Sequence, residues 1–222
     1  MLDAFEKLLD DGGDLWTALG RDGWLDALKN GVPLPEVEPL FRALGRRGID
    51  LPVTDAMVAR AAPLPATRTG CLLAVLAAAE IAGGGERLLD MSLAHAGARR
   101  QFGKPLASFQ AIQQQLAVLA EQVVLVRIAA QFGCAGGLDV TPERAAVAKH
   151  TASAAVPVMA GIAHAVHGAI GITAEFPLAR ITGRLHALRM AYGSEGYWAR
   201  VLGAARLAAG GESLVFVRGL EG

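Results

Sequence analysis

Long helical segments follow one another from Thr69 onward, and they constrain the fold more than any other feature of the sequence. The clearest segment is 108–132, in which apolar residues recur at intervals of three and four. These residues are Phe109, Ile112, Leu116, Leu119, Val123 and Val126. A helix with this spacing presents one apolar face, which is typical of packing in a helical bundle.

Four long helices are predicted in this part of the chain. They span 69–100, 108–132, 142–167 and 178–207. Thr141 is a suitable N-cap for the third helix, and Pro157 predicts a kink within it. Gly83–Gly85 predict a bend or a close helix contact in the first helix, and Gly193 marks an expected break in the fourth. Long antiparallel helices of this kind predict an all-α fold, a four-helix up-down bundle.

The N-terminal region reads as a series of short amphipathic helices without strand signals. The predicted helices span 2–9, 14–28, 36–44 and 54–62. Asp14 is a candidate N-cap for the second of them. Pro63-Leu64-Pro65 forms a stiff break, which we interpret as a domain boundary. The predicted organisation is a short-helix region at 1–63 followed by the bundle at 64–222.

Composition narrows the possible partners and location. Lys and Arg together number 21, as do Asp and Glu, so no net basic field favours nucleic acid. The most apolar stretch, 71–82, is too short to span a bilayer, and no membrane partner is expected. Two cysteines and an acidic amphipathic start predict a cytoplasmic protein with reduced thiols. A hydrophobic content of 53% suggests apolar surface buried between subunits.

A basic turn joins the first two long helices and is the main candidate for ligand binding. Arg99 and Arg100 close the first helix, where the negative end of the helix dipole favours cations. Gln101 and Gln110 add amide donors, so the turn suits a phosphate or a ribityl-type ligand. The alternative interpretation is an ordinary helix C-terminus.

Three segments in order give the chain a resemblance to a known family. They are Arg99-Arg100-Gln101-Phe102-Gly103 with Phe109-Gln110; His167-Gly168-Ala169-Ile170-Gly171-Ile172-Thr173-Ala174-Glu175; and Tyr192-Gly193-Ser194-Glu195. Across residues 69–206 the chain resembles the C-terminal half of the acyl-CoA dehydrogenases, which are flavoproteins. Residues 25–44 bear a looser resemblance to the N-terminal helical domain of that family.

The resemblance implies FAD as a cofactor, shared with a partner subunit. In the family, the first segment and the glycine loop of one subunit reach the pyrophosphate and adenine end of a flavin held mainly by its neighbour. The residues at matching positions are Arg99, Gln101, Phe102, Gln110, His167, Gly168 and Gly171. Their chemistry agrees with that role, because arginine pairs with phosphate and glycine lets backbone approach a dinucleotide.

The chain also departs from the family pattern. Family members carry a β-domain before the bundle, and Pro63-Leu64-Pro65 leaves no room for one. Ala165 replaces a usual glutamine and Ala169 a usual glycine. The catalytic base of the family is a glutamate, but Tyr192 stands at its commonest position, or Ala191 when the loop is aligned on Glu195.

The search for a base leaves two carboxylates and no assigned catalytic residue. The other family position for the glutamate falls near Leu73. Glu80 and Glu195 are the remaining candidates, and the alternative for both is a solvated or structurally paired carboxylate. A phenol with an ordinary pKa of about 10 is a poor base at neutral pH.

The resemblance therefore implies a non-catalytic subunit. Some acyl-CoA dehydrogenases acting on steroid side chains or other bulky acyl groups are heteromers in which one subunit lacks the base. The expected partner is a full-length acyl-CoA dehydrogenase-like subunit, most simply in a heterotetramer that oxidises an acyl-CoA thioester. A non-enzymatic helical assembly or dimerisation protein is the competing hypothesis. No metal site is predicted, because His150, His164 and His167 have no carboxylate in register.

Overall fold

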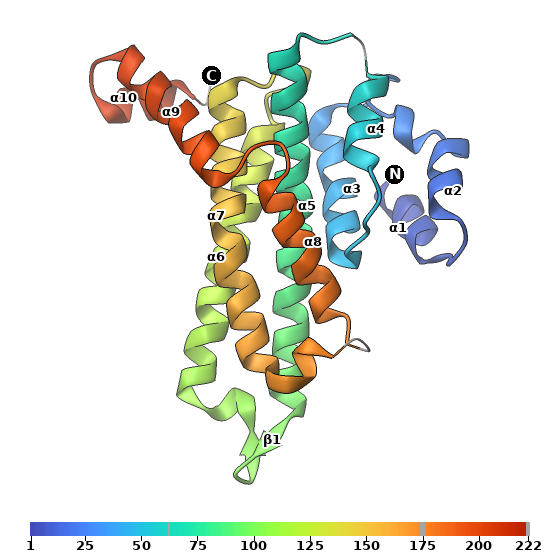
Figure 1. The fold of residues 1–222 in the computed structure, drawn as a ribbon, viewed down its shortest axis with the longest axis vertical. Coiled ribbons are helices and arrows are strands. Elements are labelled where there is room, and N and C mark those ends of the chain that lie inside the picture. Colours follow the sequence, from blue (N-terminus) through green and yellow to red (C-terminus); the bar gives the residue numbers. More distant parts are fainter. Residues whose placement is uncertain (62, 174–175, 221–222) are drawn as a thin grey trace.

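The computed structural model describes residues 1–61, 63–173 and 176–220. A long central helix, α5 (Ala66–Ala98), packs against α6 (Gln110–Cys134), α7 (Pro142–His167) and the shorter α8 (Leu178–Met190) (Figure 1). Thr141 caps α7 as predicted, since its hydroxyl accepts a hydrogen bond from the backbone N–H of Arg144 at 3.3 Å. The predicted all-α bundle is confirmed.

The N-terminal region forms short helices beside the bundle. They are α1 (Leu2–Asp10), α2 (Leu15–Arg21), the 3₁₀ turn η1 (Trp24–Asp26), α3 (Leu34–Arg47) and α4 (Val53–Arg60). Asp14 caps α2 through the N–H of Thr17 at 3.2 Å, as predicted. The single helix predicted over 14–28 is wrong, because Gly23 has a φ of +79° and ends it. Ala62, the predicted end of the last short helix, lies outside the described residues.

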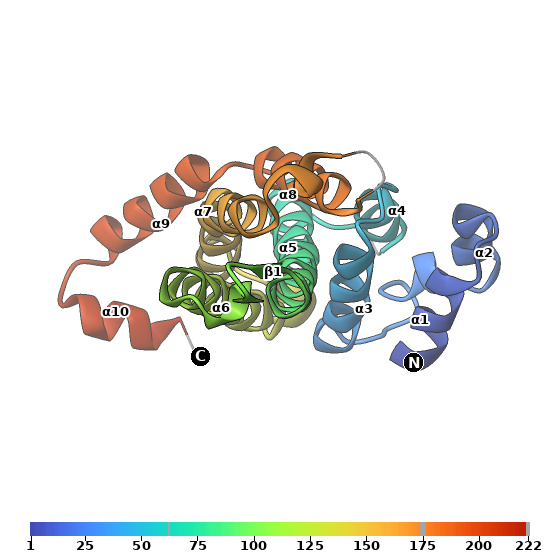
Figure 2. The ribbon, with the colours of Figure 1, turned by 90° about the horizontal axis from the view of Figure 1, so that it is seen from below.

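Helix α3 packs directly on α5, and glycines make the approach possible (Figure 2). A Cβ atom on Gly83 would lie 1.9 Å from the carbonyl oxygen of Arg42. A Cβ atom on Gly45 would lie 1.9 Å from the carbonyl oxygen of Glu80. The close helix contact predicted around Gly83 is therefore present. The short helices and the bundle share one hydrophobic core, and the boundary at Pro63 stays a prediction.

The prediction of one long helix over 178–207 is wrong, because this segment forms two helices that run in different directions. Helix α8 ends at Met190, and Tyr192 and Gly193 then take φ values of +55° and +96°. The chain resumes as α9 (Glu195–Ala209), which leaves the bundle axis, and ends with α10 (Ser213–Gly219) (Figures 1 and 2). The expected break near Gly193 is confirmed, and it redirects the chain rather than bending one helix.

Helices α6 and α7 leave apolar side chains in solvent. Val124, Leu125 and Ile128 of α6 are 43–56% exposed. By length and composition alone, α6 and the stretch Pro142–Ile172 would each be long enough to cross a membrane, and 39% and 44% of their most apolar windows are buried in the chain. Both helices pack against α5 and against each other. Their outer faces offer apolar surface for association with another subunit.

Candidate functional site

The basic turn predicted at the end of α5 is a small β-hairpin. Strand β1 (Arg100–Gln101) pairs antiparallel with β2 (Lys104–Pro105), and the 3₁₀ turn η2 (Leu106–Ser108) leads into α6. Phe102 and Gly103 form the tip with φ values of +51° and +79°. The sequence prediction missed these strands, and α6 begins at Gln110 rather than near residue 108. The hairpin forms one end of the molecule (Figure 1).

The candidate ligand-binding side chains of residues 99–110, which we call the hairpin corner, are open to solvent. Arg99, Gln101, Phe102 and Gln110 are all exposed, and Phe102 reaches 90% exposure. The side chains of Arg99, Gln101 and Gln110 have no hydrogen-bond partner or ion pair within the described chain. One guanidinium and two amides are thus available to an external phosphate or polar ligand.

The glycine loop, which forms the 3₁₀ turn η4 (Gly168–Ile172), lies next to the hairpin corner, and a pair of histidines joins them. His167, at the end of α7, stacks on His95 in the last turn of α5, with ring centroids 4.6 Å apart. The Nδ1–H of His167 donates to the carbonyl oxygen of Ala163 at 2.8 Å. Burial, reinforced by the charges of His167 and Arg99, lowers the pKa of His95. The structure therefore brings together the two segments that the sequence placed 60 to 70 residues apart.

His167 is buried rather than open to solvent, with 5% of its surface exposed. Its Nε2 atom has no hydrogen-bond partner in the described part of the chain. Gly168 has a φ of +62°, which favours glycine at the end of α7. Gly171 is packed so closely that a Cβ would lie 2.9 Å from Leu178 Cδ2. Residues 174 and 175, the end of the predicted motif, lie outside the described residues.

The hairpin corner and the glycine loop fit the phosphate end of FAD by the chemistry of their donors. Arg99, Gln101 and Gln110 offer unpartnered donors, and the Nε2 atom of His167 is an orphaned buried polar atom. Gly168 can bring backbone close to a ligand. His95 was missed by the sequence analysis, although its position one turn before Arg99 on the same helix was a usable signal.

The turn at the family position of the base holds no free carboxylate. The Tyr192 hydroxyl donates to Asp55 Oδ2 at 2.6 Å, and burial together with Asp55 raises the pKa of the phenol. Glu195 forms an ion pair with Arg189, whose hydrogen bond lowers the pKa of that carboxyl. A tyrosine held protonated and a glutamate held ionised by arginine are both poorly matched to proton abstraction near neutral pH.

Lys149 holds the turn after α8 in place, and the sequence analysis did not single it out. Its side chain is fully buried in α7. The Nζ atom donates to the carbonyl oxygens of Arg189 at 3.0 Å and Gly193 at 2.9 Å, and to Ser153 Oγ at 2.8 Å. Burial lowers the pKa of Lys149 to about 8. The ammonium thus ties the end of α8 to the turn that redirects the chain.

Glu80, the other candidate base, lies in the core between α5 and α8. Arg184 Nε donates to Glu80 Oε1 at 2.7 Å, while Arg184 Nη1 donates to Asp50 Oδ1 at 2.7 Å. Burial raises the pKa of Glu80 to about 7 despite the arginine. Only 2% of its side chain is exposed, so it is a structural hydrogen-bond partner of Arg184 that a substrate cannot reach.

Metal and thiol chemistry find no support in the described ranges. Among residues 1–61, 63–173 and 176–220, no group of three His, Cys, Asp or Glu side chains could hold a metal ion. Nε2 of His164 forms a 3.0 Å hydrogen bond with Thr182 Oγ1, which links α7 to α8. Cys71 and Cys134 are buried and unpaired, and burial raises the pKa of both thiols.

Comparisons with known proteins agree with this arrangement. A family model described as "Acyl-CoA dehydrogenase, C-terminal domain" matches residues 73–207. The acyl-CoA dehydrogenase IpdE2 of Mycobacterium tuberculosis is 35% identical over 113 residues, which cover 51% of this chain and 35% of that protein. The chain thus spans about a third of this curated relative.

Solved structures show the same partial likeness. The butyryl-CoA dehydrogenase of Megasphaera elsdenii superposes with a TM-score of 0.57 at 29% identity, over 64% of this chain and 37% of that one. A steroid ACAD designated Tcur3481-Tcur3483 superposes with a TM-score of 0.60 at 25% identity, over 64% of this chain and 40% of that one.

Proposed function

Because the chain belongs to the acyl-CoA dehydrogenase family, we propose that it acts as a non-catalytic subunit that completes the FAD site of a full-length acyl-CoA dehydrogenase-like partner. The observation that carries the proposal is a contrast within one chain. The side chains of Arg99, Gln101 and Gln110 have no hydrogen-bond partner among the described residues, whereas the two candidate bases, Glu80 and Glu195, are each held by an arginine.

In the proposed complex, Arg99 pairs with a phosphate of FAD, and Gln101 and Gln110 donate to its neighbouring oxygens. His167 and Gly168 form the adjoining wall, and Phe102 covers the ligand with an exposed apolar ring. FAD, when bound, supplies the two-electron acceptor for α,β-dehydrogenation of an acyl-CoA thioester. The chain itself binds and orients the cofactor, and the partner supplies the base.

The outer faces of α6 and α7 support association with such a partner. Val124, Leu125 and Ile128 expose apolar surface that a monomer would leave in water. The paired designation of the steroid ACAD Tcur3481-Tcur3483 supports a heteromer, with a heterotetramer as the simplest form. Buried, unpaired Cys71 and Cys134 support a reducing, cytoplasmic location.

The same apolar faces favour one competing function, a non-enzymatic assembly protein that keeps the bundle as a dimerisation surface. Flavin content separates the two. The chain is purified alone and together with a full-length acyl-CoA dehydrogenase-like protein, and the absorption spectra are compared. Yellow flavin absorbance in the complex and none in the lone chain supports the proposal. Absence of flavin from both samples supports the assembly protein.

Substitutions in the complex test the residues. We expect Arg99→Ala and Gln110→Ala, when combined, to weaken flavin binding by the complex at least tenfold, because each removes a charge-assisted or amide donor worth about 1 kcal/mol or more. Arg200→Ala on α9 is the matched control, since it removes an exposed arginine elsewhere. Full occupancy and activity after the double substitution would contradict the proposal.

A further inference from the structure

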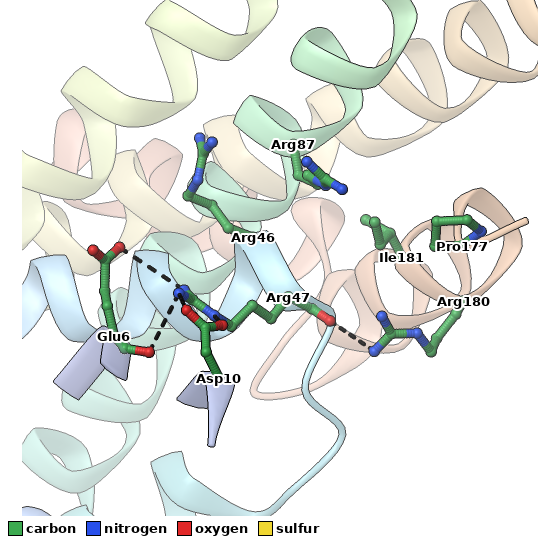
Figure 3. Close-up of a pocket in the computed structure, with 8 residues that line it drawn as sticks. All are labelled: Glu6, Asp10, Arg46, Arg47, Arg87, Pro177, Arg180 and Ile181. Carbon is green, nitrogen blue, oxygen red and sulfur yellow. Dashed lines mark hydrogen bonds and ion pairs between the residues drawn. The ribbon is translucent and has the colours of Figure 1, made fainter. Parts of the chain in front are cut away.

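A cleft rich in arginine lies where α1, α3, α5 and the start of α8 meet (Figure 3). Its volume is about 380 Å³. The charged residues that line it are Glu6, Asp10, Arg46, Arg47, Arg87 and Arg180. Ile181 and Pro177 form an apolar part of the wall. The cleft thus combines an excess of cations with a small apolar surface.

Two of the arginines are neutralised within the chain. Arg47 Nε donates to Asp10 Oδ1 at 2.8 Å, and Arg47 Nη2 donates to Asp10 Oδ2 at 2.9 Å. Arg46 donates to Asp90 at 2.6 Å and to Glu86 at 3.2 Å. Glu6 lies 3.8 Å from Arg47 and completes the acidic side of the cleft. These pairs hold the walls in place.

The other two arginines have no carboxylate partner among residues 1–61, 63–173 and 176–220. Arg180 Nη1 donates to the backbone carbonyl oxygens of Arg47 at 2.7 Å and Gly48 at 3.1 Å, which position the guanidinium but do not neutralise it. Arg87 is exposed on α5 and forms no hydrogen bond or ion pair with the part of the chain that the structure describes. Figure 3 shows the two side chains reaching the cleft from separate helices.

We propose that this cleft binds a phosphorylated anion of diphosphate type, held between Arg87 and Arg180. Two like charges facing one hollow repel each other, and an anion between them removes that cost. Guanidinium groups arriving from different walls suit a phosphate, whose oxygens point in several directions, better than a planar carboxylate. Ile181 and Pro177 would then contact the organic part of a phosphate ester.

The cleft is too far from the hairpin corner for one phosphate to bridge them. Arg87 and Arg99 are twelve residues apart, and a helix of that length spans about 18 Å. The inference therefore does not depend on the proposed flavin role. Absent pyrophosphate binding with normal flavin content in the complex would contradict the cleft proposal alone. Normal pyrophosphate binding with no flavin in the complex would contradict the proposed flavin role alone.

Calorimetric titration of the full chain with pyrophosphate at low ionic strength tests the site. We expect a dissociation constant of about 0.1–1 mM that weakens with added salt. Arg87→Gln removes a cation that has no contact in the described chain, and it should weaken binding about tenfold, the effect of one charge-assisted contact. Arg200→Gln, the same change on α9, should leave binding unchanged.

Two further measurements complete the test. Arg180→Gln should also weaken pyrophosphate binding about tenfold, and its melting temperature shows whether the lost backbone contacts disturb the fold. Titration with coenzyme A identifies the source of the phosphate: binding at least tenfold tighter than pyrophosphate points to a coenzyme A ester, and equal binding points to a free diphosphate. No binding of pyrophosphate, phosphate or coenzyme A, or equal loss in Arg87→Gln and Arg200→Gln, would overturn the proposal.

Discussion

The hairpin corner after α5 and the turn after α8 differ in what their polar side chains do. At the hairpin corner, Arg99 and Gln101 extend into solvent, and their side chains have no hydrogen-bond partner in the part of the chain that the structure describes. At the turn, Tyr192 and Glu195 are each held by another side chain of the chain itself. A binding surface keeps its donors free for an external ligand, whereas polar groups that pair with each other hold structure. The difference supports a chain that binds cofactor without abstracting a proton.

Removing Lys149 should give the largest effect, because it takes away the centre of the turn. Lys149→Ala removes the donor to the carbonyl oxygen of Gly193, leaves that of Arg189 with only the longer bond from Ser153 Oγ at 3.3 Å, and opens a cavity in α7. We expect the free energy of unfolding to fall by about 3 kcal/mol, measured by urea denaturation. Lys104→Ala, at the exposed hairpin, is the control and should change stability little. A fall below about 1 kcal/mol in Lys149→Ala would show that the turn does not depend on the ammonium.

The buried Glu80 makes the free energy of unfolding depend on pH. Burial raises the pKa of Glu80 to about 7, so the folded chain holds a proton that the unfolded chain has already released. The free energy of unfolding therefore falls as pH rises from the ordinary carboxyl range through about 7. Glu80→Gln should remove this dependence. We expect wild type to lose on the order of 2 kcal/mol more than the variant between about pH 5 and pH 8, measured by urea denaturation at each pH. Parallel curves would contradict the burial of an ionisable Glu80.

The Tyr192 hydroxyl tests how firmly the turn is tied to α4. Tyr192→Phe removes the donor to Asp55 Oδ2 and leaves the ring. We expect a loss of about 0.5–1 kcal/mol in the free energy of unfolding, since Asp55 is exposed and can bind water instead. Flavin content of the complex with the partner should not change. A flavin loss equal to that of Arg99→Ala would show that the turn also contacts the cofactor.

Much of the fold follows from sequence patterns that act over short distances. The three- and four-residue spacing of apolar side chains predicted α6, and the caps at Asp14 and Thr141 were readable because a capping residue acts within one turn. The course of α9 was not readable. Its direction depends on a positive φ at Tyr192, and a positive φ at a tyrosine cannot be predicted from the side-chain pattern.

The candidate site divides in the same way. The hairpin corner was found because its donors lie together in sequence. The partner of Glu80 is Arg184, 104 residues later, and the pairing arises only when α5 and α8 pack together. Lys149 lies in an alanine-rich helix, and its burial depends on carbonyl groups supplied by the end of α8. Contacts that tertiary packing creates could not be derived from local patterns.

The smallest expected effect on stability belongs to the hairpin corner, and it is the most informative contrast with the turn. The Arg99 side chain forms no hydrogen bond or ion pair with residues 1–61, 63–173 or 176–220. Arg99→Ala should therefore leave the free energy of unfolding of the lone chain within about 0.5 kcal/mol of wild type, measured by urea denaturation, while it lowers flavin occupancy of the complex. A ligand site is expected to be dispensable for folding and required for cofactor binding. A loss of stability comparable to that of Lys149→Ala would instead place Arg99 among the structural residues and remove the difference between the two turns.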